Sequence, residues 1–132
     1  MPQTTVPGEW TAATQPFPSK PPGFDQQGVT HDDLINFTPE LRAEAIKALE
    51  QYTIGPIYTP GTLVVEGKNK GTIVAPGLGG GANWPAGAAD PETGFVYVGS
   101  TTTPGLIGLS KNDPKVTNVD SDYMARAVGP RG

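Results

Sequence analysis

Residues 79–98 read GGGANWPAGAADPETGFVYV, and this stretch is the most informative about the architecture. Three glycines lead into Asn83 and Trp84, and a short alanine run then precedes the turn sequence Asp-Pro-Glu-Thr-Gly. The carboxylate of Asp90 and the hydroxyl of the turn's threonine can bond to the backbone of such a turn, and Gly94 can take the positive φ that closes a hairpin. Aromatic and β-branched residues follow, which favours a strand. The stretch therefore predicts an alanine strand and an aromatic-aliphatic strand joined by a tight turn, with Asn83 and Trp84 in a glycine-rich turn ahead of them.

Further β-prone runs lie on both sides of this stretch, separated by glycine and proline. With the run inside the stretch itself, they cover residues 62–65, 72–75, 95–99 and 106–109. A polar turn at residues 68–71 joins the first two runs. We therefore expect residues from about 59 onward to form a β meander.

Two helices are predicted between the first residues and the β-rich half. Thr30 is a good cap for a short helix over residues 31–36, with Asp33 as its capping-box partner. His31 would lie in the first turn, where we expect a solvated structural residue rather than a catalytic one. A second helix begins at Pro39 behind the cap Thr38.

This second helix has one apolar face and is stopped by Gly55 and Pro56. Its apolar positions are Leu41, Ala45, Ala48, Leu49 and Tyr52, and its charged positions are Arg42, Glu44, Lys47 and Glu50. We expect the charged positions to face solvent. A single helix of this length needs a partner surface to be stable.

Four regions are therefore expected. Residues 1–28 form a proline-rich extended arm, 29–55 a helical segment, 56–110 a β segment, and 111–132 an irregular tail that is cut short. The arm carries Trp10, Phe17 and Phe24, which favours an arm packed along a larger body over a free linker.

Composition excludes several kinds of function. The net charge of −4 offers no basic surface for nucleic acid or anionic lipid. No cysteine and one histidine leave no thiolate or multi-histidine metal site. No run has the roughly 20 apolar residues that span a bilayer, and the first ten residues do not read as an export signal. Glycine and proline supply 18 and 15 of the 132 residues, so much of the backbone must be loop.

The stretch 79–98 resembles the blades of quinoprotein glucose and alcohol dehydrogenases, which bind pyrroloquinoline quinone (PQQ). Residues 6–10 (VPGEW), 14–18 (TQPFP) and 55–60 (GPIYTP) resemble the segment that precedes the Asn-Trp turn in the membrane-associated glucose dehydrogenases. The family's repeat commonly has tryptophan where this chain has Val98. The resemblance implies a chain that is mainly β with a short helical insertion, one or two blades of a β-propeller.

The resemblance also implies a cofactor contact. Asn83 would donate its side-chain amide to a quinone oxygen of PQQ, with Trp84 lining the pocket. The catalytic base and the ligands of the calcium ion are expected outside this chain, so no catalytic or metal-binding residue is assigned within it. Asp90 belongs to a hairpin turn and is a poor candidate for the base.

The implied activity is a PQQ-dependent dehydrogenase, membrane-associated or periplasmic, that oxidises a glucose-like sugar or an alcohol and passes electrons to a quinone or a cytochrome. A propeller has about four to eight blades of roughly 40 to 50 residues. The other partners are therefore the remaining blades, and we expect this chain alone to be an inactive fragment of a longer reading frame.

Other interpretations remain open from the residues alone. Asn83 can be a turn residue and Trp84 a plug between blades. Residues 77–81 do not read as a phosphate loop, because no Lys-Ser or Lys-Thr follows them. The alternative function is a non-catalytic β-rich module that binds a protein or a carbohydrate through Trp10, Phe17 and Trp84.

Overall fold

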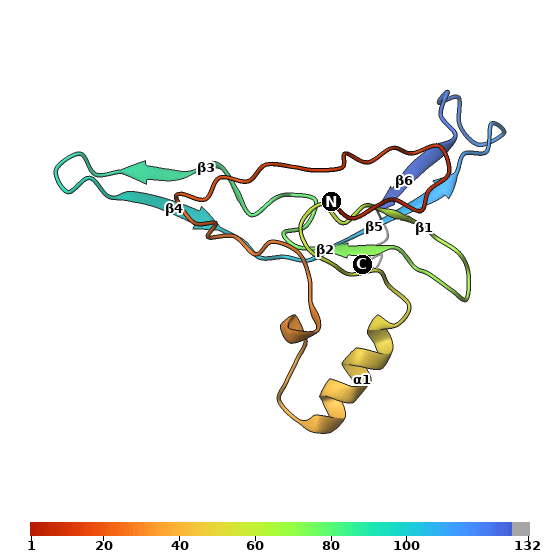
Figure 1. The fold of residues 1–132 in the computed structure, drawn as a ribbon, viewed down its shortest axis with the longest axis horizontal. Coiled ribbons are helices and arrows are strands. Elements are labelled where there is room, and N and C mark those ends of the chain that lie inside the picture. Colours follow the sequence, from red (N-terminus) through yellow and green to blue (C-terminus); the bar gives the residue numbers. More distant parts are fainter. Residues whose placement is uncertain (128–132) are drawn as a thin grey trace.

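The computed structural model describes residues 1–127, apart from the side chains of residues 84–86, 126 and 127. Its elements in chain order are the 3-10 helix η1 (His31–Asp33), the α-helix α1 (Pro39–Leu49) and the strands β1 (Thr62–Leu63), β2 (Thr72–Val74), β3 (Ala82–Ala89), β4 (Val96–Ser100), β5 (Gly105–Lys111) and β6 (Tyr123–Ala127). The chain is mainly β with one short α-helix, as predicted. Figure 1 shows the β3–β4 hairpin reaching out to one side, β5 and β6 to the other, and α1 standing below them.

Both helices begin where their caps predict. The Thr30 amide donates to Asp33 Oδ2 at 2.7 Å, and the Thr30 side chain accepts in return from the first turn, so the capping box is present. Thr38 Oγ1 accepts from Leu41 N at the start of α1, with Pro39 in the first turn.

The first helix is shorter than predicted, and the reason is a side chain of α1. Arg42 donates from its guanidinium to the carbonyls of His31 and Leu34, at 2.8 and 3.1 Å. These bonds satisfy carbonyls that a longer helix would use, and Leu34 is extended. The prediction of a solvent-facing side chain is therefore wrong for Arg42, which is only 25% exposed, whereas Glu44, Lys47 and Glu50 are exposed as predicted.

Helix α1 ends at Leu49, before the predicted stop at Gly55 and Pro56. Only Leu49 of the apolar face is buried, and Leu41 remains 41% exposed. In the described part of the chain, Leu41 and Ala48 of this face are thus exposed, while Ala45 and Tyr52 are half-buried.

Strand β5 is the centre of a four-stranded sheet. Strand β6 pairs antiparallel with residues 107–111, β2 pairs antiparallel with residues 105–107, and β1 pairs parallel with residues 108 and 109. Because β6 occupies one edge of β5 here, β2 and β1 follow one another along the other edge.

The predicted meander is therefore wrong for β1 and β2, while β3 with β4 and β5 with β6 form antiparallel pairs of consecutive strands. Strands β1 and β2 do not pair with each other, although a polar turn separates them. A small bridge between Val65 and Asn69 closes that turn, and both strands bond instead to β5, which comes later in the chain. Only a few residues of each run are regular, too few to form a stable hairpin by themselves.

Strand β6 lies in the stretch 111–132, where we expected irregular structure. The residues of β6 include alanine, methionine and arginine, which favour helix, so local preference does not indicate a strand. Pairing with β5 over five residues decides its conformation.

The core is small and partly polar. The buried apolar residues are Val6, Val29, Leu49 and Ala75. Thr72 is fully buried as well, and its hydroxyl donates to the carbonyl of Pro60 at 2.9 Å. Thr62 Oγ1 lies 3.3 Å from Thr72 Oγ1, which joins β1 to β2 through side chains.

The proline-rich arm contacts this body at a few points, but the three aromatic residues on which the prediction of packing rested, Trp10, Phe17 and Phe24, all remain exposed. It runs first toward β6 and then back toward β3 and β4 (Figure 1). Val6 is buried, and the ring of Phe17 packs at 5.6 Å from the ring of Tyr58. Trp10 is not covered and stays 83% exposed.

The accessible surface is large for the mass of the chain. It measures 10168 Å² for 13.7 kDa, whereas a compact folded monomer of this mass exposes about 6,600 Å².

Within residues 1–127, none of the helices has the length and hydrophobicity needed to cross a bilayer. The described strands do not close into a ring of blades, which agrees with part of a propeller.

Candidate functional site at the β3–β4 hairpin

Asn83 lies near the start of β3, on the exposed surface of the hairpin. Its side-chain amide donates to the carbonyl of Gly79 at 3.3 Å. The sequence predicts a turn at this position, and the structure has an extended strand instead. Trp84 follows on the same strand, but its side chain lies outside the described part of the structure, so its predicted role in lining a pocket stays a prediction.

The strand is irregular around these two residues. Ala82 pairs with Ser100 of β4, and regular pairing resumes only at Gly87 opposite Val98. Pro85, which has no amide hydrogen to donate, falls between these pairs, where the register shifts. The ladder therefore fixes the two ends of this part of β3 but not the residues in between.

A glycine-rich loop leads into β3. Gly77 donates to Thr103 O at 2.8 Å, and Gly80 donates to Gly77 O at 2.9 Å with a φ of +74°. A Cβ at Gly79 or Gly80 would meet no heavy atom within 4 Å. The backbone beside Asn83 is thus open on the side where those side chains would stand, so a flat ligand could approach closely.

A hollow of about 310 Å³ adjoins this loop. Gly77 and Leu78 form part of its wall, and Tyr58 and Ile107 lie on other parts. Its volume is at the lower end of the range for small-molecule sites.

The turn at the tip of the hairpin has the predicted bond from its backbone to Asp90, but not the predicted bond from Thr93 to the backbone. Asp90 Oδ1 accepts from the amide of Glu92 at 2.9 Å, and Gly94 has a φ of +74°. The hydroxyl of Thr93 donates to Asp90 Oδ2 at 2.7 Å rather than to the backbone. The bond from Thr93, and then that from the Glu92 amide, hold the pKa of Asp90 below its usual value. A lowered pKa makes Asp90 a weaker base.

At the other end of the hairpin, Asp25 contacts both strands. Its Oδ2 accepts from the amide of Ala82 at 3.2 Å, and its Oδ1 accepts from the hydroxyl of Ser100. Asp25 was not predicted as a site residue from the sequence. An aspartate in a proline-rich arm has no local pattern that indicates a partner so far along the chain.

The apolar residues of β4 and the residue just before it are left uncovered by the described part of the chain. Phe95, Val96, Tyr97 and Val98 are all exposed, Val96 by 70%. Val98 occupies the position where the family's repeat commonly has tryptophan.

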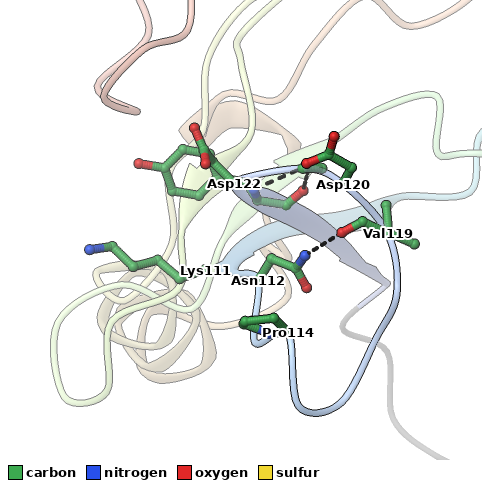
Figure 2. A pocket seen from close by; sticks show the side chains of 8 residues that line it. Lys111, Asn112, Pro114, Val119, Asp120 and Asp122 are labelled. Atoms are coloured by element: carbon green, nitrogen blue, oxygen red, sulfur yellow. Dashed lines mark hydrogen bonds between the residues drawn. The ribbon is translucent and has the colours of Figure 1, made fainter.

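A separate pocket of about 450 Å³ lies in the connection between β5 and β6, on the far side of the molecule from the β3–β4 hairpin (Figure 1). In the wall of this pocket, Asn112 Nδ2 donates to Val119 O at 2.7 Å (Figure 2). The side chains of Asp120, Asp122 and Lys111 stand apart around it. None of the predicted site residues lies in its wall.

The described residues contain no group of three or more histidine, aspartate or glutamate side chains that could hold a metal ion. The carboxylates that a calcium site usually needs are therefore not gathered among these residues.

One family model matches the chain. Its description is PQQ, glucose/ethanol/alcohol dehydrogenase, β-propeller domain, and the match covers residues 1–131. No curated protein and no solved structure matches the chain.

Proposed function

Because the chain belongs to the β-propeller family of PQQ-dependent glucose, ethanol and alcohol dehydrogenases, we propose that it supplies part of the cofactor pocket in an enzyme that oxidises a sugar or an alcohol. The observation that carries this proposal is the exposed position of Asn83 directly behind the open glycine-rich loop.

The residues present suit a flat, polar cofactor. The side-chain amide of Asn83 can donate to a quinone oxygen of PQQ. An amide offers both a donor and an acceptor atom, which suits the polar edge of this cofactor. Gly79 and Gly80 leave the neighbouring backbone free of side chains. Trp84, next on the strand, would line the same pocket.

When bound, PQQ accepts the hydride that leaves the substrate's carbinol carbon. The part of this chain would be to orient the cofactor and to narrow its access to water. The group that takes the hydroxyl proton would belong to another blade, because Asp90 is held in its turn and its pKa is lowered. Calcium would likewise be held by residues of other blades.

The remaining blades are the first partners that this proposal requires. They would cover the apolar residues of β4 and the exposed face of α1. The substrate would be a glucose-like sugar or a simple alcohol, and the electron acceptor a quinone or a cytochrome. The enzyme would work in the periplasm or at the membrane facing it.

The test is a titration of PQQ into the full-length protein that contains this segment, with Asn83→Ala compared with the parent. Losing one hydrogen bond should weaken PQQ binding by about tenfold or less. Asn118→Ala is the matched control, because Asn118 is exposed and lies outside the hairpin. Unchanged affinity in Asn83→Ala, or an equal loss in the control, would overturn the assignment of Asn83.

Dye reduction by the reconstituted protein with glucose and with ethanol then identifies the substrate class. Activity with neither a sugar nor an alcohol would contradict the proposed reaction.

A further inference from the structure

Asp25 joins three parts of the molecule that the sequence separates widely. Its carboxylate accepts from Ala82 at the start of β3 and from Ser100 at the end of β4. Ala82 and Ser100 face each other as the pair at the open end of the hairpin. One carboxylate of the arm therefore holds both strands at the base of the hairpin.

The arm is itself anchored to the body just beyond Asp25. Gly28 donates to Ala75 O at 2.8 Å, and Val29 donates to Gly55 O at 2.9 Å. Val29 is buried. Residues 25–29 thus form a bracket whose one end holds the hairpin and whose other end is fixed in the small core.

The backbone at Gly81 is shaped for this contact. A Cβ at Gly81 would lie 2.6 Å from Asp25 Oδ2, closer than real contacts allow. Gly81 also accepts from the amide of Thr101 at 3.1 Å. The absence of a side chain at Gly81 lets the carboxylate reach the Ala82 amide.

The side chain of Asn83 bonds to Gly79 O, and its backbone is tied to β4 next to this bracket. Asn83 follows Ala82 directly, and the ladder with β4 does not resume until Gly87. On the N-terminal side of Asn83, the last tie to β4 is therefore the Ala82–Ser100 pair, to which Asp25 is bonded. A shift of that pair would move the side chain of Asn83 with it.

We propose that Asp25 is a positioning residue, which sets the location of Asn83 relative to the body and so acts on cofactor binding through Asn83. This inference rests on the proposed function of Asn83. It assigns to the proline-rich arm a role in the cofactor site that its distance in sequence does not suggest.

A double-mutant cycle in the full-length protein tests the coupling. PQQ affinity is measured for the parent, Asp25→Ala, Asn83→Ala and the double variant. We expect Asp25→Ala to weaken PQQ binding, and the double variant to be little weaker than Asn83→Ala alone, because the two side chains act in series. Additive losses would overturn the inference while leaving the assignment of Asn83 intact.

A second measurement does not depend on PQQ. Hydrogen exchange in the peptide covering residues 81–88 should become about tenfold faster in Asp25→Ala, since about tenfold corresponds to one lost hydrogen bond. Ser100→Ala should give a smaller change in the same peptide. Exchange in residues 105–111 should stay as in the parent, which separates a local effect from general unfolding.

Asp113→Ala is the matched control, because within the described residues Asp113 bonds to its own turn, to the amide of Lys115 at 2.9 Å and, through its carbonyl, to the amides of Val116 and Thr117. Unchanged exchange at residues 81–88 in Asp25→Ala would overturn the role of Asp25, whatever PQQ affinity shows. If Asn83→Ala leaves PQQ affinity unchanged, the proposed function of Asn83 fails, and the exchange data alone report whether Asp25 holds the hairpin.

Discussion

At the scale of single residues, hydrogen bonds of polar side chains stabilise this small core where larger cores rely on apolar packing. Asn69 is the main example. Its Oδ1 accepts from the Gly71 amide at 2.7 Å and from Thr62 Oγ1 at 3.2 Å, while its Nδ2 donates to Thr53 Oγ1 at 2.9 Å. One side chain thereby connects β1, the start of β2 and the segment that follows α1.

Asn69→Ala should destabilise this region by about 1–3 kcal/mol, because it leaves the buried Gly71 amide without its acceptor. The measurement is hydrogen exchange at Gly71 and Thr72. Asn118→Ala, at an exposed position, should leave both rates unchanged. If Gly71 exchanges at the parent rate in Asn69→Ala, the network does not stabilise the strand.

The turn at Asp90 predicts a dependence on pH. The pKa of Asp90 lies below the usual 3.8 because Thr93 and the Glu92 amide donate to its carboxylate. The folded pKa is thus lower than the unfolded pKa, so the turn is stabilised above the unfolded value. That stabilisation is lost as pH falls below about 4 and through the folded pKa.

Thr93→Val should raise the pKa of Asp90 toward its usual value, because Thr93 is the larger cause of the shift. A carboxyl NMR titration measures this change. The control is Thr102→Val, an exposed threonine outside the turn, which should not alter the titration. An unshifted midpoint in Thr93→Val would show that the hydroxyl is not bonded to Asp90.

At the scale of elements, the molecule depends on close approaches that only glycine permits. Gly28 has a φ of +104° and forms a bridge with Pro56. A Cβ there would lie 2.5 Å from Gly55 O and 2.6 Å from Pro56 Cα. The arm can reach the body at this point only without a side chain.

Gly28→Ala should therefore release the end of the arm, with faster hydrogen exchange at the Val29 amide. Gly28→Ala can act through backbone strain at positive φ or through a clash of the new Cβ. Gly8→Ala has the strain alone, because Gly8 has a φ of +84° but no heavy atom lies within 4 Å of a Cβ placed there. Strain alone should cost roughly 1–3 kcal/mol at either position, and the clash adds to it at Gly28. Equal losses of stability in Gly28→Ala and Gly8→Ala would show that the close approach to Gly55 does not contribute to the loss.

At the scale of the whole molecule, the chain exposes more surface than a compact monomer of the same mass. The excess over a compact monomer is about 3,600 Å², and Val96 and Phe37 are among the large apolar side chains left exposed. A protein–protein interface of standard size buries about 1,600 Å². The uncovered surface is thus large enough for contacts with more than one neighbouring unit.

The isolated 132-residue chain should consequently unfold in urea with a shallow, weakly cooperative transition, and it should bind a hydrophobic dye. The slope of unfolding reports the surface that unfolding exposes, so it should fall below that of a compact domain of equal length. A single steep transition without dye binding would favour the alternative of an independent, non-catalytic module.

Local patterns in the sequence determined the features that depend on neighbours along the chain. The caps Thr30, Thr38 and Asp33, the start of α1 and the turn at Asp90 are confirmed, because each needs only bonds within a few residues. The family was also apparent from the sequence, and its model covers residues 1–131. The contacts of Asn83 and Trp84 with PQQ, and the division of the chain into four regions, stay predictions.

Only the tertiary structure decided which strands pair and what holds the candidate site. The parallel pairing of β1 with β5, the strand β6 and the extended backbone at Asn83 all depend on partners distant in sequence. The bond from Asp25 to the hairpin is of the same kind. Such contacts form where folding brings two segments together, and the residues near each segment in the chain contain no information about which partner that will be.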